Sequence, residues 1–105
     1  MSFEKYATAV NKTRNPKLTT EQQASNWALG VTGEAGEVAD IIKKHLYHGK
    51  PLDKEHLVEE MGDVLYYIQA LCNMYSVSME YVMLKNSDKL AKRYPNGFVE
   101  GGGKR

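Results

Sequence analysis

The chain has 105 residues, of which 42% are hydrophobic and 26% are charged. This composition fits one globular domain over residues 1–105 and excludes a disordered tail or a fibrous repeat. Fourteen lysines and arginines nearly balance thirteen aspartates and glutamates, so the net charge of +1 creates no overall attraction to nucleic acid or to an anionic membrane. We therefore expect neither as a partner.

Two further features of the sequence indicate the cellular compartment in which the protein is expected. The N-terminal sequence MSFEKYATAV lacks the basic region and apolar core of a signal peptide, and no apolar run approaches about 18 residues. The single cysteine, Cys72, excludes an intramolecular disulfide and fits a reducing environment. A soluble cytoplasmic protein is expected.

Hydrophobic spacing predicts a short first helix and a long second one. The first helix carries an apolar stripe: Phe3, Tyr6, Ala7 and Val10. It ends before Asn15, which Pro16 restricts to extended conformations. Thr20 and Gln23 have the spacing of a capping box, so the second helix is expected from Thr20 to about His48.

The second half of the chain predicts two more helices. Gly49 and Pro51 end the second helix, and Asp53 can cap a third. The third helix has a long apolar face: Leu57, Met61, Val64, Leu65, Ile68, Leu71 and Cys72. Ser76 or Ser78 can begin a fourth helix that stops at the sequence YPNG, after which VEGGGKR is expected to fray. We expect an all-α, four-helix, bundle-like domain with the second and third helices as its long central pair.

Two pairs of acidic residues lie on the edges of these central helices. Glu34 and Glu37 share one stripe of the second helix, and Glu60 and Asp63 share one stripe of the third, because residues three apart project together. If the helices pack antiparallel, the two stripes can converge at one rim of their interface. Each pair taken singly is also the pattern of a solvated helix face, and that interpretation stays open.

Carboxylates brought this close would repel one another unless cations lay between them. Oxygen ligands without histidine or cysteine favour Mg²⁺, or Mn²⁺, over zinc or redox metals. Glycines inside both acidic repeats, Gly36 and Gly62, suggest a need for room beside the acids, although close helix packing would also explain them.

The motifs GEAGEVAD, EEMGDVLYYI and KNSDKLAKRYPNGF, in this order, resemble the MazG-like all-α nucleoside triphosphate pyrophosphohydrolases. The similarity spans roughly Gln22 to Phe98, which suggests a core of about 20–98 in a single domain. Some members of the family carry two such domains, and this chain has one.

The resemblance implies hydrolysis of a (deoxy)nucleoside triphosphate to the monophosphate and pyrophosphate, with housecleaning of the nucleotide pool as the expected role. It implies that Glu34, Glu37, Glu60 and Asp63 hold Mg²⁺, and that a catalytic carboxylate, Glu37 or Glu34, accepts a proton from the attacking water. Glu59 lies about 100° around the helix from Glu60 and is assigned to solvent or to the residues that surround the metal ligands.

Five further residues are candidate substrate ligands. Lys89 and Arg93, four residues apart, can bind phosphate, although cations near a helix C-terminus also complement its dipole. Asn86 is carried over from the resemblance alone, as an amide that assists substrate or metal binding. Trp27 and Tyr67, in phase with the acidic pairs, can stack on a base or belong to the core.

The small size of the domain and its apolar first and fourth helices suggest self-association. The resemblance implies oligomers, and we expect a homotetramer, with a dimer as the fallback. Two other classes of function stay open at this point: an oligomeric helical interaction module, and a nucleotide-binding regulator without turnover.

Overall fold

The structure is a computed structural model that describes residues 1–101. Within them the chain forms four α-helices, and its one β-bridge, between Pro95 and Gly97, is isolated. The helices are α1 (Phe3–Asn11), α2 (Thr20–Tyr47), α3 (Lys54–Met74) and α4 (Met79–Arg93). The all-α fold is confirmed. Residues 99–101 are outside any helix, and the rest of the expected frayed tail lies outside the described residues.

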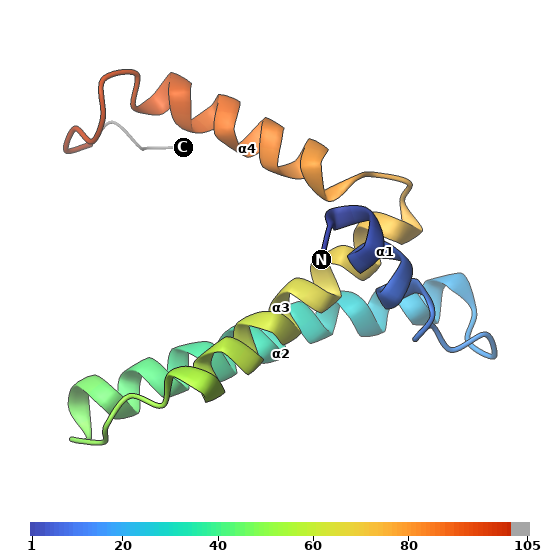
Figure 1. The fold of residues 1–105 in the computed structure, drawn as a ribbon, viewed down its shortest axis with the longest axis horizontal. Helices are drawn as coiled ribbons and strands as arrows, with labels where there is room; N and C mark the ends of the chain where they lie inside the picture. The colour runs from blue at the N-terminus through green and yellow to red at the C-terminus, as the bar shows by residue number, and fades with distance from the viewer. Residues whose placement is uncertain (102–105) are drawn as a thin grey trace.

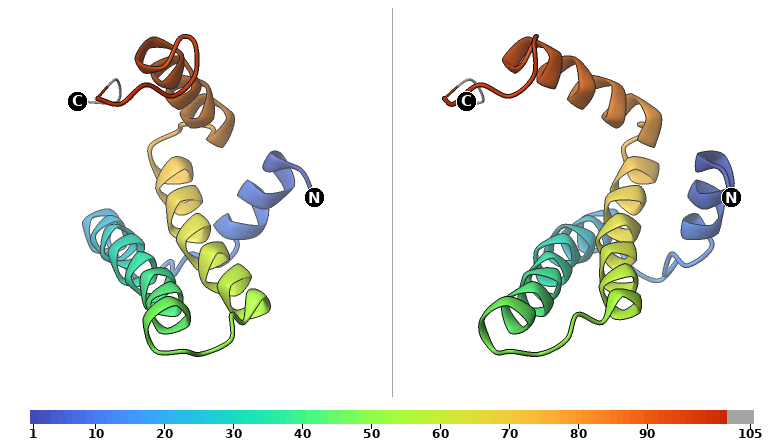
Figure 2. Two further views of the ribbon diagram at one scale, coloured as in Figure 1. Left: turned by 90° about the vertical axis from the view of Figure 1, so that its left-hand side faces the viewer. Right: turned by 60° about the vertical axis from the view of Figure 1, so that its left-hand side comes forward.

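The long helices α2 and α3 form an antiparallel hairpin, and α1 lies against α3 near the open end of that hairpin (Figures 1 and 2). The buried core lies at this end, around Val10, Trp27 and Ala70. Polar contacts also join α1 to α3, because Asn73 Nδ2 donates a hydrogen bond to the carbonyl oxygen of Ala7 at 2.9 Å. The other end of the hairpin is the short loop between α2 and α3.

The start of α2 corrects the expected capping box by one residue. Thr19 is the N-cap, its side chain accepts from the backbone N–H of Gln22 at 3.1 Å, and Gln22 Oε1 accepts from the backbone N–H of Thr19 at 2.9 Å. Gln23 cannot play this part because its side chain is buried near the indole of Trp27. Asp53 caps α3 as expected.

The turn between α3 and α4 sends α4 away from the hairpin. Ser76 has a left-handed backbone, with φ of 56°, and the backbone N–H of Val77 donates to the carbonyl oxygen of Cys72 at 2.9 Å. These two features define a Schellman C-terminal motif, and Ser78 then caps α4. As a result α4 stands apart from α2 and α3 in all three views (Figures 1 and 2).

Over residues 1–101, no helix is both long enough and apolar enough to cross a bilayer.

The left-handed residue in the α3–α4 turn yields a first prediction. Because only glycine adopts this backbone without a steric cost, Ser76→Gly should raise the free energy of unfolding by about 0.5–1 kcal/mol, and Ser76→Val should lower it by about 1–2 kcal/mol. Urea unfolding followed by circular dichroism measures both changes. Equal midpoints for the two variants would contradict this account of the turn.

Candidate metal centre

Packing of α2 on α3 brings three carboxylates together. One carboxylate oxygen from each of Glu34, Glu60 and Asp63 lies within 4.8 Å of the other two. Glu34 and Glu60 are partly buried, and Asp63 is exposed. Glu60 and Asp63 are three residues apart on α3, so both project toward Glu34 on α2. We call these three residues the acidic cluster.

The carboxylates of the acidic cluster repel one another when no cation lies between them. The pKa of Glu34 rises from its ordinary value of 4.5 to about 7. A hydrogen bond with Glu60 is the largest cause, followed by partial burial and by the negative charges of Glu60, Asp63 and Glu37. Below about pH 7 the carboxyl group of Glu34 therefore favours its protonated form, and a positive ion at this place would favour the ionised form.

Glu37 lies one helical turn beyond Glu34, is exposed, and is outside the group of three. Its carboxylate lines a polar pocket at the loop end of the hairpin, beside Asp40, Lys44 and His56. Its charge still reaches the acidic cluster, because it contributes to the raised pKa of Glu34. The structure thus brings together three of the four expected ligands, and the role of Glu37 stays a prediction.

One neighbour of the site was missed from the sequence. His56 Nε2 lies 3.5 Å from Glu60 Oε1, and the two residues are four apart on α3. Protonated His56 would form an ion pair that holds the Glu60 side chain in place. The four-residue spacing is visible in the sequence and could have indicated this contact.

The two candidate stacking residues belong to the packed end of the hairpin. Trp27 is 7% exposed and lies in the core, where its Nε1 donates to Gln23 at 3.3 Å when the Gln23 amide is turned to satisfy both of its partners. Tyr67 is partly buried and meets Tyr66 edge to face. Burial favours a core role for Trp27, while Tyr67 keeps a partly open face.

The glycines inside the two acidic repeats lie in open surroundings. A Cβ at Gly36 or Gly62 would meet nothing within 4 Å among the described residues, so close packing inside the chain does not explain them. Gly30 is the crowded position, because a Cβ there would lie 2.5 Å from the ring of Tyr67. The Tyr67 ring therefore lies directly against the backbone of α2.

The cations and the amide of α4 are not brought to the acidic cluster within one chain. Lys89 and Asn86 are exposed and Arg93 is partly buried, all on a helix that stands apart from the α2–α3 hairpin (Figure 2). Their expected role in phosphate binding stays a prediction.

The fold and the acidic cluster together define a class: an all-α protein in which two facing helices present a group of carboxylates that could hold a metal ion. Residues 22–98 match the family model described as the MazG nucleotide pyrophosphohydrolase domain. The chain therefore belongs to the MazG nucleotide pyrophosphohydrolase family.

Three relatives are similar to most or much of the chain. Gene 37 protein of Mycobacterium phage L5 is 34% identical over 79 residues, which cover 71% of this chain and 69% of that protein. Uncharacterized protein YvdC of Bacillus subtilis (strain 168) is 40% identical over 70 residues, which cover 58% of this chain and 66% of that protein. dCTP pyrophosphatase 1 of Rattus norvegicus is 31% identical over 85 residues, covering 75% of this chain and 50% of that protein. No solved structure matches the chain.

The raised pKa of Glu34 gives a second prediction. In the folded, metal-free protein Glu34 binds its proton more tightly than in the unfolded chain, so the contribution of Glu34 to stability is fully present below pH 4.5 and is lost as the pH rises through about 7. Glu34→Gln should flatten this decline, and saturating Mg²⁺ should reduce it by favouring the ionised form.

Thermal unfolding in EDTA over this pH range measures the decline. Glu59→Gln is the matched control, because Glu59 is exposed and lies outside the acidic cluster, and it should keep the slope of the parent. Identical slopes for Glu34→Gln and the parent would show that the carboxylates are not coupled.

Proposed function

We propose that the chain hydrolyses a (deoxy)nucleoside triphosphate to the monophosphate and pyrophosphate with the help of Mg²⁺, for which Mn²⁺ can substitute. The observation that carries this proposal is the meeting of Glu34, Glu60 and Asp63 from two facing helices. Membership of the MazG family supports the reaction class. A similar protein is named dCTP pyrophosphatase 1, which supports a nucleoside triphosphate as substrate. Housecleaning of the nucleotide pool is the role that we propose for this reaction.

The donor set of the acidic cluster fits Mg²⁺. All three groups offer carboxylate oxygen, which hard divalent cations prefer, and the raised pKa of Glu34 indicates an excess of negative charge that a cation would relieve. Glu34, Glu60 and Asp63 would hold the ion, with Glu37 as a fourth ligand or as a base. Bound Mg²⁺ would neutralise part of the triphosphate charge and lower the pKa of the attacking water.

The surroundings of Glu37 support its assignment as general base ahead of Glu34. Glu37 is exposed and stands outside the group of three, so its carboxylate is free to accept a proton from water. It is nevertheless close enough to affect the pKa of Glu34, so it lies near the expected position of the reaction. Tyr67, whose ring is partly open at the same helix interface, is the better candidate of the two aromatic residues for contact with a base.

Phosphate binding is assigned to α4. Lys89 and Arg93 would contact the β and γ phosphates, and the amide of Asn86 would assist. Water would attack the α-phosphorus, so that pyrophosphate leaves as one group. Because α4 stands apart from the hairpin in one chain, these contacts require another copy or a movement of α4.

Self-association is part of the proposal, as a homotetramer or else a dimer. Large apolar side chains stay exposed in the single chain, among them Leu29 at 68% and Leu46 at 60%. Such side chains are often buried between subunits.

A third prediction tests the activity. A panel of canonical and modified nucleoside triphosphates with Mg²⁺ should show release of pyrophosphate and monophosphate for at least one substrate. Glu60→Gln should lower kcat by about 100-fold or more, because it removes transition-state charge stabilisation worth several kcal/mol. Glu59→Gln is the control and should stay near the parent rate.

Two results would speak for other functions. Saturable nucleotide binding without pyrophosphate release would indicate a binding regulator. Absence of nucleotide binding and of hydrolysis, together with properties that change neither with Mg²⁺ nor in Glu60→Gln, would indicate a helical interaction module whose acids are only solvated.

A fourth prediction concerns the position of attack. In ¹⁸O-labelled water the label should enter the nucleoside monophosphate, because attack at the α-phosphorus makes the new P–O bond there and breaks the bond to pyrophosphate. Mass spectrometry of both products measures the label. Label found in pyrophosphate alone would refute this pathway. Inorganic phosphate and a nucleoside diphosphate as first products would refute it too, even if the protein is a metal-dependent hydrolase.

A further inference from the structure

Glu60 is the member of the acidic cluster that has neighbours of two kinds. Two of them are acids: Glu34 shares a hydrogen bond with the Glu60 carboxyl group, and Asp63 lies one turn further along α3. The third neighbour is basic, because His56 Nε2 lies 3.5 Å from Glu60 Oε1. The Glu60 side chain is only 17% exposed, so these neighbours, more than water, decide how its two oxygens are directed.

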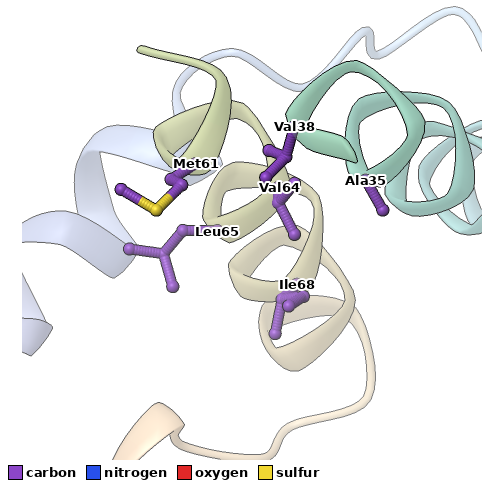
Figure 3. A pocket seen from close by; sticks show the side chains of 6 residues that line it. All are labelled: Ala35, Val38, Met61, Val64, Leu65 and Ile68. Carbon is purple, nitrogen blue, oxygen red and sulfur yellow. The ribbon is translucent and has the colours of Figure 1, made fainter. Parts of the chain in front are cut away.

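The apolar side chains that flank the acidic cluster offer no hydrogen-bond donor. They line a groove between α2 and α3 (Figure 3): Ala35, Val38, Met61, Val64, Leu65 and Ile68. The two ion-pair contacts in residues 1–101 join Lys44 to Asp40 and His56 to Glu60. Within this part of the chain, His56 is therefore the one basic side chain paired with the cluster.

The start of α3 fixes the position of His56 but does not explain the choice of histidine. Asp53 caps the helix, and its Oδ1 accepts a hydrogen bond from the backbone N–H of His56 at 3.1 Å. A basic side chain in the first turn gains nothing from the helix dipole, which favours acids at that end. The contact with Glu60 gives this side chain a role that the helix start does not.

Imidazole can direct a metal-binding carboxylate. Nε2–H donates a hydrogen bond both in one neutral tautomer and in the imidazolium, so the contact does not require a charge on His56. At 3.5 Å it is roughly half an ångström longer than the commonest N–H···O distance, as is frequent at such sites before the ligand binds. With Oε1 held by His56, the other oxygen of Glu60 is left for the ion. Hydrogen-bond partners of this kind set the orientation and the affinity of metal ligands.

We propose that His56 is a positioning residue: it holds one carboxylate oxygen of Glu60 through Nε2–H and so directs the other oxygen to the cation of the acidic cluster. His56 itself touches neither the ion nor the nucleotide. Without it, Glu60 keeps only its acidic neighbours and turns more readily to the hydrogen bond with Glu34, whose proton a cation must displace. The inference rests on the proposed function, because it presumes a divalent cation at this place.

Calorimetric titration with Mg²⁺, and in parallel with Mn²⁺, tests this role without any nucleotide. His56→Ala should lower the affinity for the ion by about tenfold or more, the usual effect of removing a hydrogen-bond partner from a metal ligand. His45→Ala is the matched control and should bind the ion like the parent. His45 lies with His56 at the loop end of the hairpin, but its Nδ1 lies 2.9 Å from the carbonyl oxygen of Lys50.

A double-mutant cycle with Glu60→Asp separates positioning from a general loosening of the start of α3. Aspartate keeps the carboxylate, but its side chain is one methylene group shorter and loses the contact with His56. If His56 acts through Glu60, His56→Ala should change the affinity by less than about twofold in the Glu60→Asp background. Circular dichroism should show the same helix content for all four proteins of the cycle.

Two outcomes would overturn the inference. If His56→Ala binds Mg²⁺ and Mn²⁺ as tightly as the parent, His56 does not position Glu60. If His56→Ala costs as much affinity in the Glu60→Asp background as in the parent, its effect comes through the start of α3 and not through Glu60.

The titrations also separate this inference from the proposed function. If the parent shows the expected cycle but releases no pyrophosphate from any triphosphate, the positioning role stands and the proposed reaction is wrong. If the parent hydrolyses a triphosphate and His56 is not coupled to Glu60, only the inference is wrong. If the parent binds neither ion, both the metal site and the role of His56 are wrong.

Discussion

The contact between Gly30 and Tyr67 sets the register of the α2–α3 hairpin, and the acidic cluster depends on that register. Since Gly30 has no Cβ, the Tyr67 ring lies against the backbone of α2. The two helices are antiparallel, so one turn forward from Gly30 on α2 corresponds to one turn back from Tyr67 on α3. That step leads to Glu34 and Asp63, which meet in the cluster. A side chain at position 30 would push Tyr67 away and move the carboxylates apart.

The convergence of the acids could be predicted from one helical spacing and one short loop. The three-residue spacing of Glu60 and Asp63 placed both on one stripe, and the short loop after α2 required an antiparallel partner. Together they predicted that acids from both helices converge, as Glu34, Glu60 and Asp63 do. The number of helices and the cap at Asp53 could also be predicted, because both depend on residues that are close in the sequence.

Features that depend on distant residues could not be predicted in this way. Thr20 and Gln23 had the right spacing for a capping box, but Gln23 is buried near Trp27, and so the box forms one residue earlier. The direction in which α4 leaves the hairpin depends on a left-handed backbone at Ser76. Serine rarely adopts this conformation, so the sequence does not predict it. The separation of Lys89 from the carboxylates is a consequence of that single turn.

The buried side chains of the hairpin gather at its open end, which divides it into two halves of different local stability. In α2 and α3, both described throughout, the buried residues are Gln23, Trp27, Gln69, Ala70 and Cys72. The half nearer the loop lacks such residues, so its amides should exchange with solvent through openings that cost less than global unfolding. The acidic cluster joins α2 to α3 between the two halves. A cation bound there would hold α2 against α3 in the half that has few buried side chains. Binding of the cation would therefore lower the frequency of local opening in that half.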